Sequence, residues 1–248
     1  MHRSILLHHH LLKNGGSSFD AMLHASFGPH WGTFDPVETL GHDADPSHLE
    51  AFIAEHPELR AISSHIVRPP CAQIGEVRVY PVVFLRDPIV RMASVWAFLR
   101  QQHVADVLVA AARAHGFAEF VASLLERKRA ANLQARMLAG VTTCCPAHHR
   151  RPAPDEIEER AHRALDELPV IGIVERYDES LRAFGAWLAP EFPELRLESR
   201  WIHRGDHGLN THEAIEARLG TPLYERLRAA NALDAALHAK ALERLAAR

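Results

Sequence analysis

Several features that would define a specialised class of protein are scarce in this sequence. Its three cysteines are an odd number and two are adjacent, so they form neither a disulfide framework nor a cysteine metal site with paired spacing. No apolar run reaches the roughly 18 residues that span a bilayer. The first apolar run meets three histidines at once, which does not fit a cleavable signal segment. We therefore expect a cytoplasmic protein with no membrane span.

Charge of one sign is also scarce. The formal net charge is -3, from 28 basic and 31 acidic side chains, so no general basic field attracts a nucleic acid. The 19 histidines fall in separate patches without cysteine or carboxylate partners at ligand spacing, and we interpret them as composition rather than as metal ligands. Any anion site must therefore be local, and no nucleic-acid partner is expected.

What the chain does contain is ordinary for a globular protein. Apolar residues make up 47% of the chain and charged residues 24%, which predicts one domain over residues 1–248. Apolar, β-rich runs alternate with amphipathic stretches, which predicts an α/β fold with a mostly parallel central sheet and helices on both faces. The predicted helices cover about 47–55, 88–102, 104–114, 117–126, 130–139, 154–168, the stretch after a cap at Asp178, and 221 to the end. A long loop is expected over Gly28–Pro46.

The first candidate site follows the first apolar run. Lys13, Asn14, Gly15 and Gly16 form a turn, and a helix with a Ser17 or Ser18 cap is expected to follow. Free N–H groups at a helix start, together with a lysine, are the parts of a phosphate cradle. The order differs from a Walker A loop, in which the lysine comes after the glycines.

The second candidate site follows the most apolar run, VRVYPVVFL. That run predicts a buried parallel strand, which places Arg86 at its end, and Asp87 before Pro88 signals the start of a helix. Ser94 falls about two turns into that helix. Two anion-binding segments on one sheet edge suit a ligand with phosphates at both ends.

Together, HHHLLKNGGSSF and FLRDPIVRMASVWAFLR resemble the two nucleotide-binding motifs of the sulfotransferase family that includes heparan sulfate 2-O-sulfotransferase. Leu12 stands where that family usually has proline, and Asn14 replaces a threonine. The resemblance continues in weaker form through most of the chain. It implies a sulfotransferase fold like that of the P-loop nucleotide kinases, and an activity that moves the sulfuryl group of 3′-phosphoadenosine 5′-phosphosulfate (PAPS) to a hydroxyl or amine, releasing 3′-phosphoadenosine 5′-phosphate (PAP).

The resemblance also implies roles for individual residues. The 5′-phosphosulfate would be held by the first motif, Lys13, Asn14, Gly15, Gly16, Ser17 and Ser18. Arg86 and Ser94 would hold the 3′-phosphate, and Arg204, in a late polar loop, would touch the nucleotide. His65 follows a predicted strand and matches a histidine assigned as the base, although Ser64 replaces the usual glycine. No metal is required by this scheme.

Other interpretations stay open. Arg91 fits a surface or salt-bridging arginine as well as a ligand contact, and Gln134 and Arg136 fit either acceptor contacts or an exposed helix face. A nucleotide-dependent phosphotransferase would use a similar strand–loop–helix site, although the only candidate Mg²⁺ ligand, Asp87, is a better helix cap. A non-catalytic protein that binds a nucleotide or glycan is the third alternative. The acceptor, possibly a saccharide, and the oligomeric state have no recognisable code in the sequence.

Overall fold

The computed structural model describes residues 3–36, 46–69, 73–127, 131–141, 152–198 and 208–248. Within these residues a six-stranded sheet has the order β2-β3-β1-β5, with β4 beside the start of β5 and β6 beside its end. All pairs are parallel except β4 with β5, which agrees with the predicted α/β fold. The strands are β1 (Arg3–His9), β2 (Trp31–Thr33), β3 (Ala61–Ser64), β4 (Gln73–Ile74), β5 (Val77–Leu85) and β6 (Gly172–Ile173).

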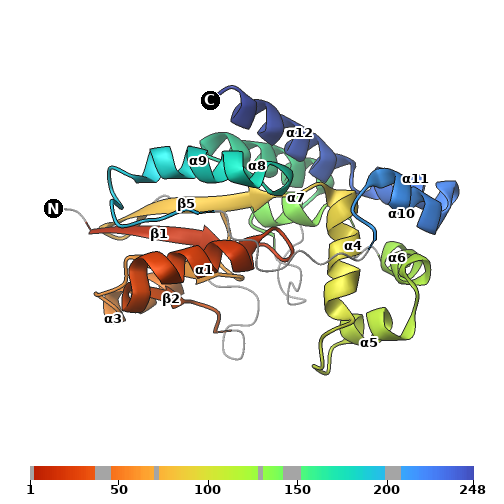
Figure 1. Cartoon of the computed structure of the whole chain (residues 1–248), viewed down its shortest axis with the longest axis horizontal. Helices are drawn as coiled ribbons and strands as arrows, with labels where there is room; N and C mark the ends of the chain where they lie inside the picture. Colours follow the sequence, from red (N-terminus) through yellow and green to blue (C-terminus); the bar gives the residue numbers. More distant parts are fainter. Residues whose placement is uncertain (1–2, 37–45, 70–72, 128–130, 142–151, 199–207) are drawn as a thin grey trace.

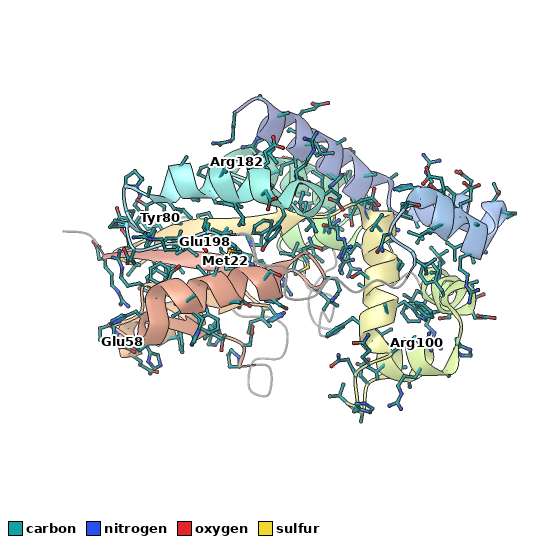
Figure 2. The ribbon with its side chains drawn as sticks, viewed as in Figure 1. Met22, Glu58, Tyr80, Arg100, Arg182 and Glu198 are labelled. Atoms are coloured by element: carbon teal, nitrogen blue, oxygen red, sulfur yellow. The ribbon has the colours of Figure 1, made fainter. Side chains whose placement is uncertain are left out.

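Helices cover both faces of the sheet, as Figure 1 shows. Successive side chains of β5 point to opposite faces, so Val82 and Phe84 pack with α1 and α9, whereas Val83 and Leu85 pack with α7, α8 and α12. Met22, labelled in Figure 2, is buried on the side of α1 that faces the sheet. The helices of these layers are α1 (Gly16–Phe27), α3 (Pro46–Glu55), α7 (Leu133–Leu138), α8 (Pro154–Glu167), α9 (Tyr177–Leu188) and α12 (Ala232–Ala246).

A second hydrophobic cluster lies beyond the carboxyl ends of the strands, on the right of Figure 1. Trp96 of α4 packs there with Phe117 and Phe120 of α6. Among the described helices, none combines the length and the apolar character that a bilayer span requires. The helices of this cluster are α4 (Pro88–Leu99), α5 (Val107–Ala114), α6 (Phe117–Glu126), α10 (His212–Leu219) and α11 (Thr221–Ala230).

Some local predictions are confirmed and others are wrong. Asp87 caps α4, accepting hydrogen bonds from the N–H groups of Ile89 and Val90, and Pro88 is the first helical residue. The expected loop over 28–46 instead contains the short turn η1 (Gly28–His30) and then β2, which is too short to produce a periodic pattern. Nor does Asp178 cap α9, because the preceding turn η2 (Val174–Arg176) runs directly into the helix and leaves Asp178 inside its first turn.

Candidate functional site

The predicted anion-binding segments do meet at one edge of the sheet. The turn with Lys13 follows β1, His65 follows β3 and Arg86 follows β5, and these three strands are adjacent and parallel. From β1 the chain moves to one side of the sheet, to β2 and β3, and then crosses to β5 on the other side of β1. Ligands of open parallel sheets bind at such a switch point, outside the carboxyl ends of the strands.

The turn between β1 and α1 depends on two left-handed residues. Lys13 has φ 64° and Gly15 has φ 76°, and Gly15 is the residue that precedes the helix. The prediction of a Ser17 or Ser18 cap is therefore wrong, because the backbone turns before either serine and both lie in the first helical turn. Within the described residues, the N–H groups of Gly16 and Ser17 have no hydrogen-bond partner. They are free to bind an anion, which the dipole of the helix also favours.

Two arginines from the end of β5 and from α4 hold this turn. The Nη1 group of Arg86 donates to the carbonyl of Lys13 at 3.1 Å, and Nε of Arg91 donates to the carbonyl of Leu12 at 3.0 Å. Arg91 is therefore not a surface residue, and its exposed fraction is only 3%. Ser94, one turn further along α4, is also buried. The guanidinium groups thus leave the amides of the turn free while placing positive charge beside them.

The positive groups at the turn are incompletely neutralised by the described residues. Burial, and then the charge of Arg86, lower the pKa of Lys13, whose Nζ lies 4.6 Å from the centre of the Phe98 ring. Burial lowers the pKa of Arg91 to about 10, and its Nη2 is buried without a hydrogen-bond partner in this part of the chain. Nε of Arg86 is 3.9 Å from Glu175 Oε1, too far for a hydrogen bond. A bound anion would relieve this repulsion and supply the missing acceptors.

Asn14 has a structural role that differs from the predicted one. Its Nδ2 donates to the carbonyl of Phe84 and to Oε1 of Gln134, each at 2.7 Å, so no hydrogen is left for a ligand. Gln134 also exchanges two hydrogen bonds with the backbone of Arg86 and is 1% exposed, which excludes the exposed helix face. Together the two amides fix the end of β5 against the turn, so the Asn14 side chain has no free donor for the predicted contact with the nucleotide.

His65 is held by an acidic partner that the sequence did not indicate. Asp35 accepts hydrogen bonds from the backbone N–H of His65 at 2.6 Å and from its Nδ1 at 2.8 Å. The hydrogen bond from Nδ1 raises the pKa of His65, against the opposing effect of burial. The side chain is 49% exposed, so Nε2 is left as the available nitrogen. Asp35 lies in the segment expected to be a loop, with no local motif around it.

His10 connects His65 to the start of α1. The His10 ring stacks on the His65 ring with centres 4.1 Å apart. The His10 ring also fills the space beside Gly16, where an added Cβ would lie only 2.1 Å from it. Nδ1 of His10 is 2.8 Å from Asp20 Oδ2, and Nδ1 of His8 is 2.7 Å from Asp20 Oδ1. The expectation that the histidines lack a carboxylate partner is therefore wrong for this patch, because α1 packs Asp20 against β1.

The remaining predicted residues are placed as follows. Ser18 is buried and Ser17 is exposed in the first turn of α1. Arg204 lies outside the described residues, so its predicted contact with the nucleotide stays a prediction. His238, in another histidine patch, has its Nε2 3.1 Å from Oε2 of Glu175, the carboxylate that also lies near Arg86.

Comparison with known proteins finds a similar sequence but assigns no activity to this protein. No family model matches the chain. A protein from Archaeoglobus fulgidus, described as uncharacterized, is 24% identical to it over 262 aligned residues. The alignment covers 98% of each chain, so the similarity extends across the sheet and the helical cluster alike.

Proposed function

We propose that this protein is a sulfotransferase, which moves the sulfuryl group of PAPS to a hydroxyl or amine of an acceptor such as a saccharide. The observation that carries the proposal is the meeting of Lys13, the free amides at the start of α1 and Arg86 at one edge of the sheet. A donor with a phosphosulfate at one end and a 3′-phosphate at the other needs two such anion contacts. The resemblance of both sequence segments to sulfotransferase motifs supports the same assignment.

Each part of the donor has a proposed contact. Lys13 and the N–H groups of Gly16 and Ser17 hold the 5′-phosphosulfate, with the Ser17 hydroxyl as a further donor. Arg86 and Ser94 hold the 3′-phosphate. The incompletely neutralised positive charge around the turn favours binding of the negatively charged 5′-phosphosulfate there.

The residues at this edge of the sheet could carry out the transfer step without a further reactant. The acceptor oxygen attacks sulfur as the bond from sulfur to the 5′-phosphate oxygen breaks, and the electron pair of that bond goes to the phosphate oxygen. Lys13 stabilises the negative charge that forms there. His65 takes the acceptor proton at Nε2, since its Nδ1 is bonded to Asp35. In-line transfers of this kind depend mainly on positioning and charge stabilisation.

The phosphotransferase alternative has less support at this site. Its candidate Mg²⁺ ligand, Asp87, accepts hydrogen bonds from two backbone N–H groups at the start of α4 through Oδ1, and its Oδ2 lies 2.9 Å from Nε2 of His212. Both carboxylate oxygens are therefore already used. This leaves the acid in a structural role and favours a donor that needs no metal at its phosphates.

Calorimetric titration of PAP, AMP and ATP tests the proposal. We expect PAP to bind about 10- to 100-fold more tightly than AMP, since charge-assisted hydrogen bonds to the 3′-phosphate contribute about 1.5–3 kcal/mol. Arg86→Ala should weaken PAP more than AMP, because it removes the 3′-phosphate contact as well as the hydrogen bond that holds the carbonyl of Lys13, whereas Lys13→Ala should weaken both alike. Arg100→Ala is the matched control, because this exposed arginine follows the far end of α4 (Figure 2).

The outcomes separate the three functions. Equal binding of PAP and AMP, or stronger binding of ATP, would exclude the sulfotransferase and favour a phosphotransferase. PAP binding without PAP release from PAPS, across a panel of saccharide acceptors, would identify a non-catalytic nucleotide-binding protein. In a sulfotransferase, His65→Ala retains PAP binding and loses PAP release.

A further inference from the structure

Two histidines and one aspartate meet at the base of α1. His8 and His10 are two residues apart at the end of β1, so their side chains lie on the same face of the sheet, the face that α1 covers. Asp20 reaches them from the second turn of α1. The ligand atoms of all three side chains lie within 4.8 Å of one another. The sequence alone gives no reason for this meeting, because Asp20 is separated from the histidines by the whole turn.

Asp20 lies close enough to both histidines for its carboxylate to share one ion with each of them. The two N···O distances are 2.7 Å and 2.8 Å. Two ligands of a tetrahedral ion with bonds of 2.0–2.1 Å are about 3.3 Å apart, so each of these two pairs would have to open by about half an ångström. Nδ1 of His10 is buried and makes no properly aligned hydrogen bond within the described residues, even though Asp20 Oδ2 is so near. A buried lone pair beside a carboxylate is the arrangement that a cation completes.

Outer contacts orient the carboxylate as they do in metal sites. The Ser63 hydroxyl donates to Asp20 Oδ1 at 2.5 Å, and Nε1 of Trp31 donates to Ser63 Oγ at 3.1 Å. Such a second layer of hydrogen bonds fixes ligand orientation and supports affinity. The His8 side chain is 1% exposed, whereas His10 and Asp20 are 11% and 18% exposed, which leaves one open side for entry and for water ligands.

We propose that His8, His10 and Asp20 bind one divalent transition-metal ion, such as Zn²⁺, with the remaining positions open to water. Two imidazoles and one carboxylate suit Zn²⁺, Co²⁺ or Fe²⁺ better than Mg²⁺ or Ca²⁺, which prefer oxygen ligands alone. The ion lies next to the ring of His10 that packs on Gly16, so it would add positive charge near the start of α1. The proposal does not depend on the identity of the nucleotide.

The test uses full-length protein purified without a histidine tag, stripped with a chelator and titrated with Zn²⁺ and with Co²⁺. We expect one tight equivalent, and a loss of affinity of at least about 100-fold in His10→Gln and Asp20→Asn. Ser63→Ala removes the hydroxyl that donates to Asp20 and accepts from Trp31, and it should weaken binding about tenfold. His24→Gln is the matched control, since His24 is an exposed histidine on the same helix. Unchanged binding in both ligand variants would overturn the proposal.

A second measurement needs no variant, which matters if a buried substitution unfolds the protein. X-ray absorption of the wild type loaded with one equivalent of Zn²⁺ counts the ligands directly. Two imidazole nitrogens with the rest oxygen supports the site. A shell with sulfur, with fewer than two imidazoles, or no tight equivalent at all would overturn it, and Asp20 would then act as a hydrogen-bond bridge between two histidines.

Discussion

Gly16 has no room for a side chain, and this predicts the effect of the smallest possible substitution. A Cβ at this position would lie 2.1 Å from the His10 ring, whereas ordinary contacts begin near 3.4 Å. The ring would have to move by about 1.3 Å, away from its stack with His65. Overpacking of this kind costs about 1–3 kcal/mol. The φ angle is not left-handed, so the cost comes from the contact rather than from backbone strain.

We therefore expect Gly16→Ala to lower the free energy of unfolding by about 1–2 kcal/mol, after allowing for the better helix propensity of alanine. Gly185→Ala is the control of opposite sign. Gly185 lies inside α9, and no neighbouring atom of the described residues comes within 4 Å of the position that a Cβ would take, so the substitution should stabilise the protein by about 0.5–1 kcal/mol. Urea unfolding followed by circular dichroism measures both changes.

A double-mutant cycle isolates the contact. In a His10→Ala background the ring is gone, so Gly16→Ala should become neutral or slightly stabilising, with a coupling energy of about 2 kcal/mol. PAP affinity should fall in Gly16→Ala because the amides at the start of α1 shift with the ring. Equal destabilisation by Gly16→Ala in both backgrounds would refute the argument that His10 fills this space.

Three further predictions concern buried polar groups at the same edge. Because the pKa of Lys13 is lowered, PAP affinity should be full below that pKa and fall as the pH rises through it, at a lower pH than for an exposed lysine. Titrations of PAP between pH 7 and 10 measure this fall, and Lys13→Arg should show no such change of affinity with pH. A wild-type affinity that does not change over this range would contradict the prediction. Asn14→Asp removes both hydrogen-bond donors to Phe84 and Gln134 and should cost about 3 kcal/mol in urea unfolding. Asp234→Ala removes the acceptor of two backbone N–H groups and the carboxylate whose charge acts on buried Arg91, so it should lower the free energy of unfolding by about 3–5 kcal/mol. For Asn14→Asp or Asp234→Ala, a loss below about 1 kcal/mol would show that the contacts of that residue are not formed.

The long strands and the start of α4 are predictable from the sequence because their causes are local. The alternation of β-rich runs with amphipathic stretches predicts a mostly parallel sheet covered on both faces, and the structure has it. Asp87 before Pro88 carries its own cap chemistry, so the start of α4 is predicted to the residue. The placement of Lys13, His65 and Arg86 at one edge follows from strand ends alone, since parallel strands bring their carboxyl ends together.

Short elements and partner choice are not predictable in this way. The three residues of β2 form a strand only because β3 lies beside them, and α10 begins at a Thr211 cap in a segment for which the sequence predicts no helix. The motif around Asn14 predicts a side-chain donor for a ligand, but in the structure both hydrogens of Nδ2 go to the carbonyl of Phe84 and to Gln134, which are distant in the sequence.

By itself, the sequence determined the fold class and the edge at which the predicted anion-binding groups collect, because periodicity and caps act between near neighbours. Only the tertiary structure decided which groups pair there. Asp35 meets His65 across 30 residues and Asp20 meets His8 across 12, and no local preference encodes either meeting. Packing of α1 and of the segment after β2 against the strand ends sets these contacts, and they orient the histidines on which both the proposed proton transfer and the proposed metal site depend.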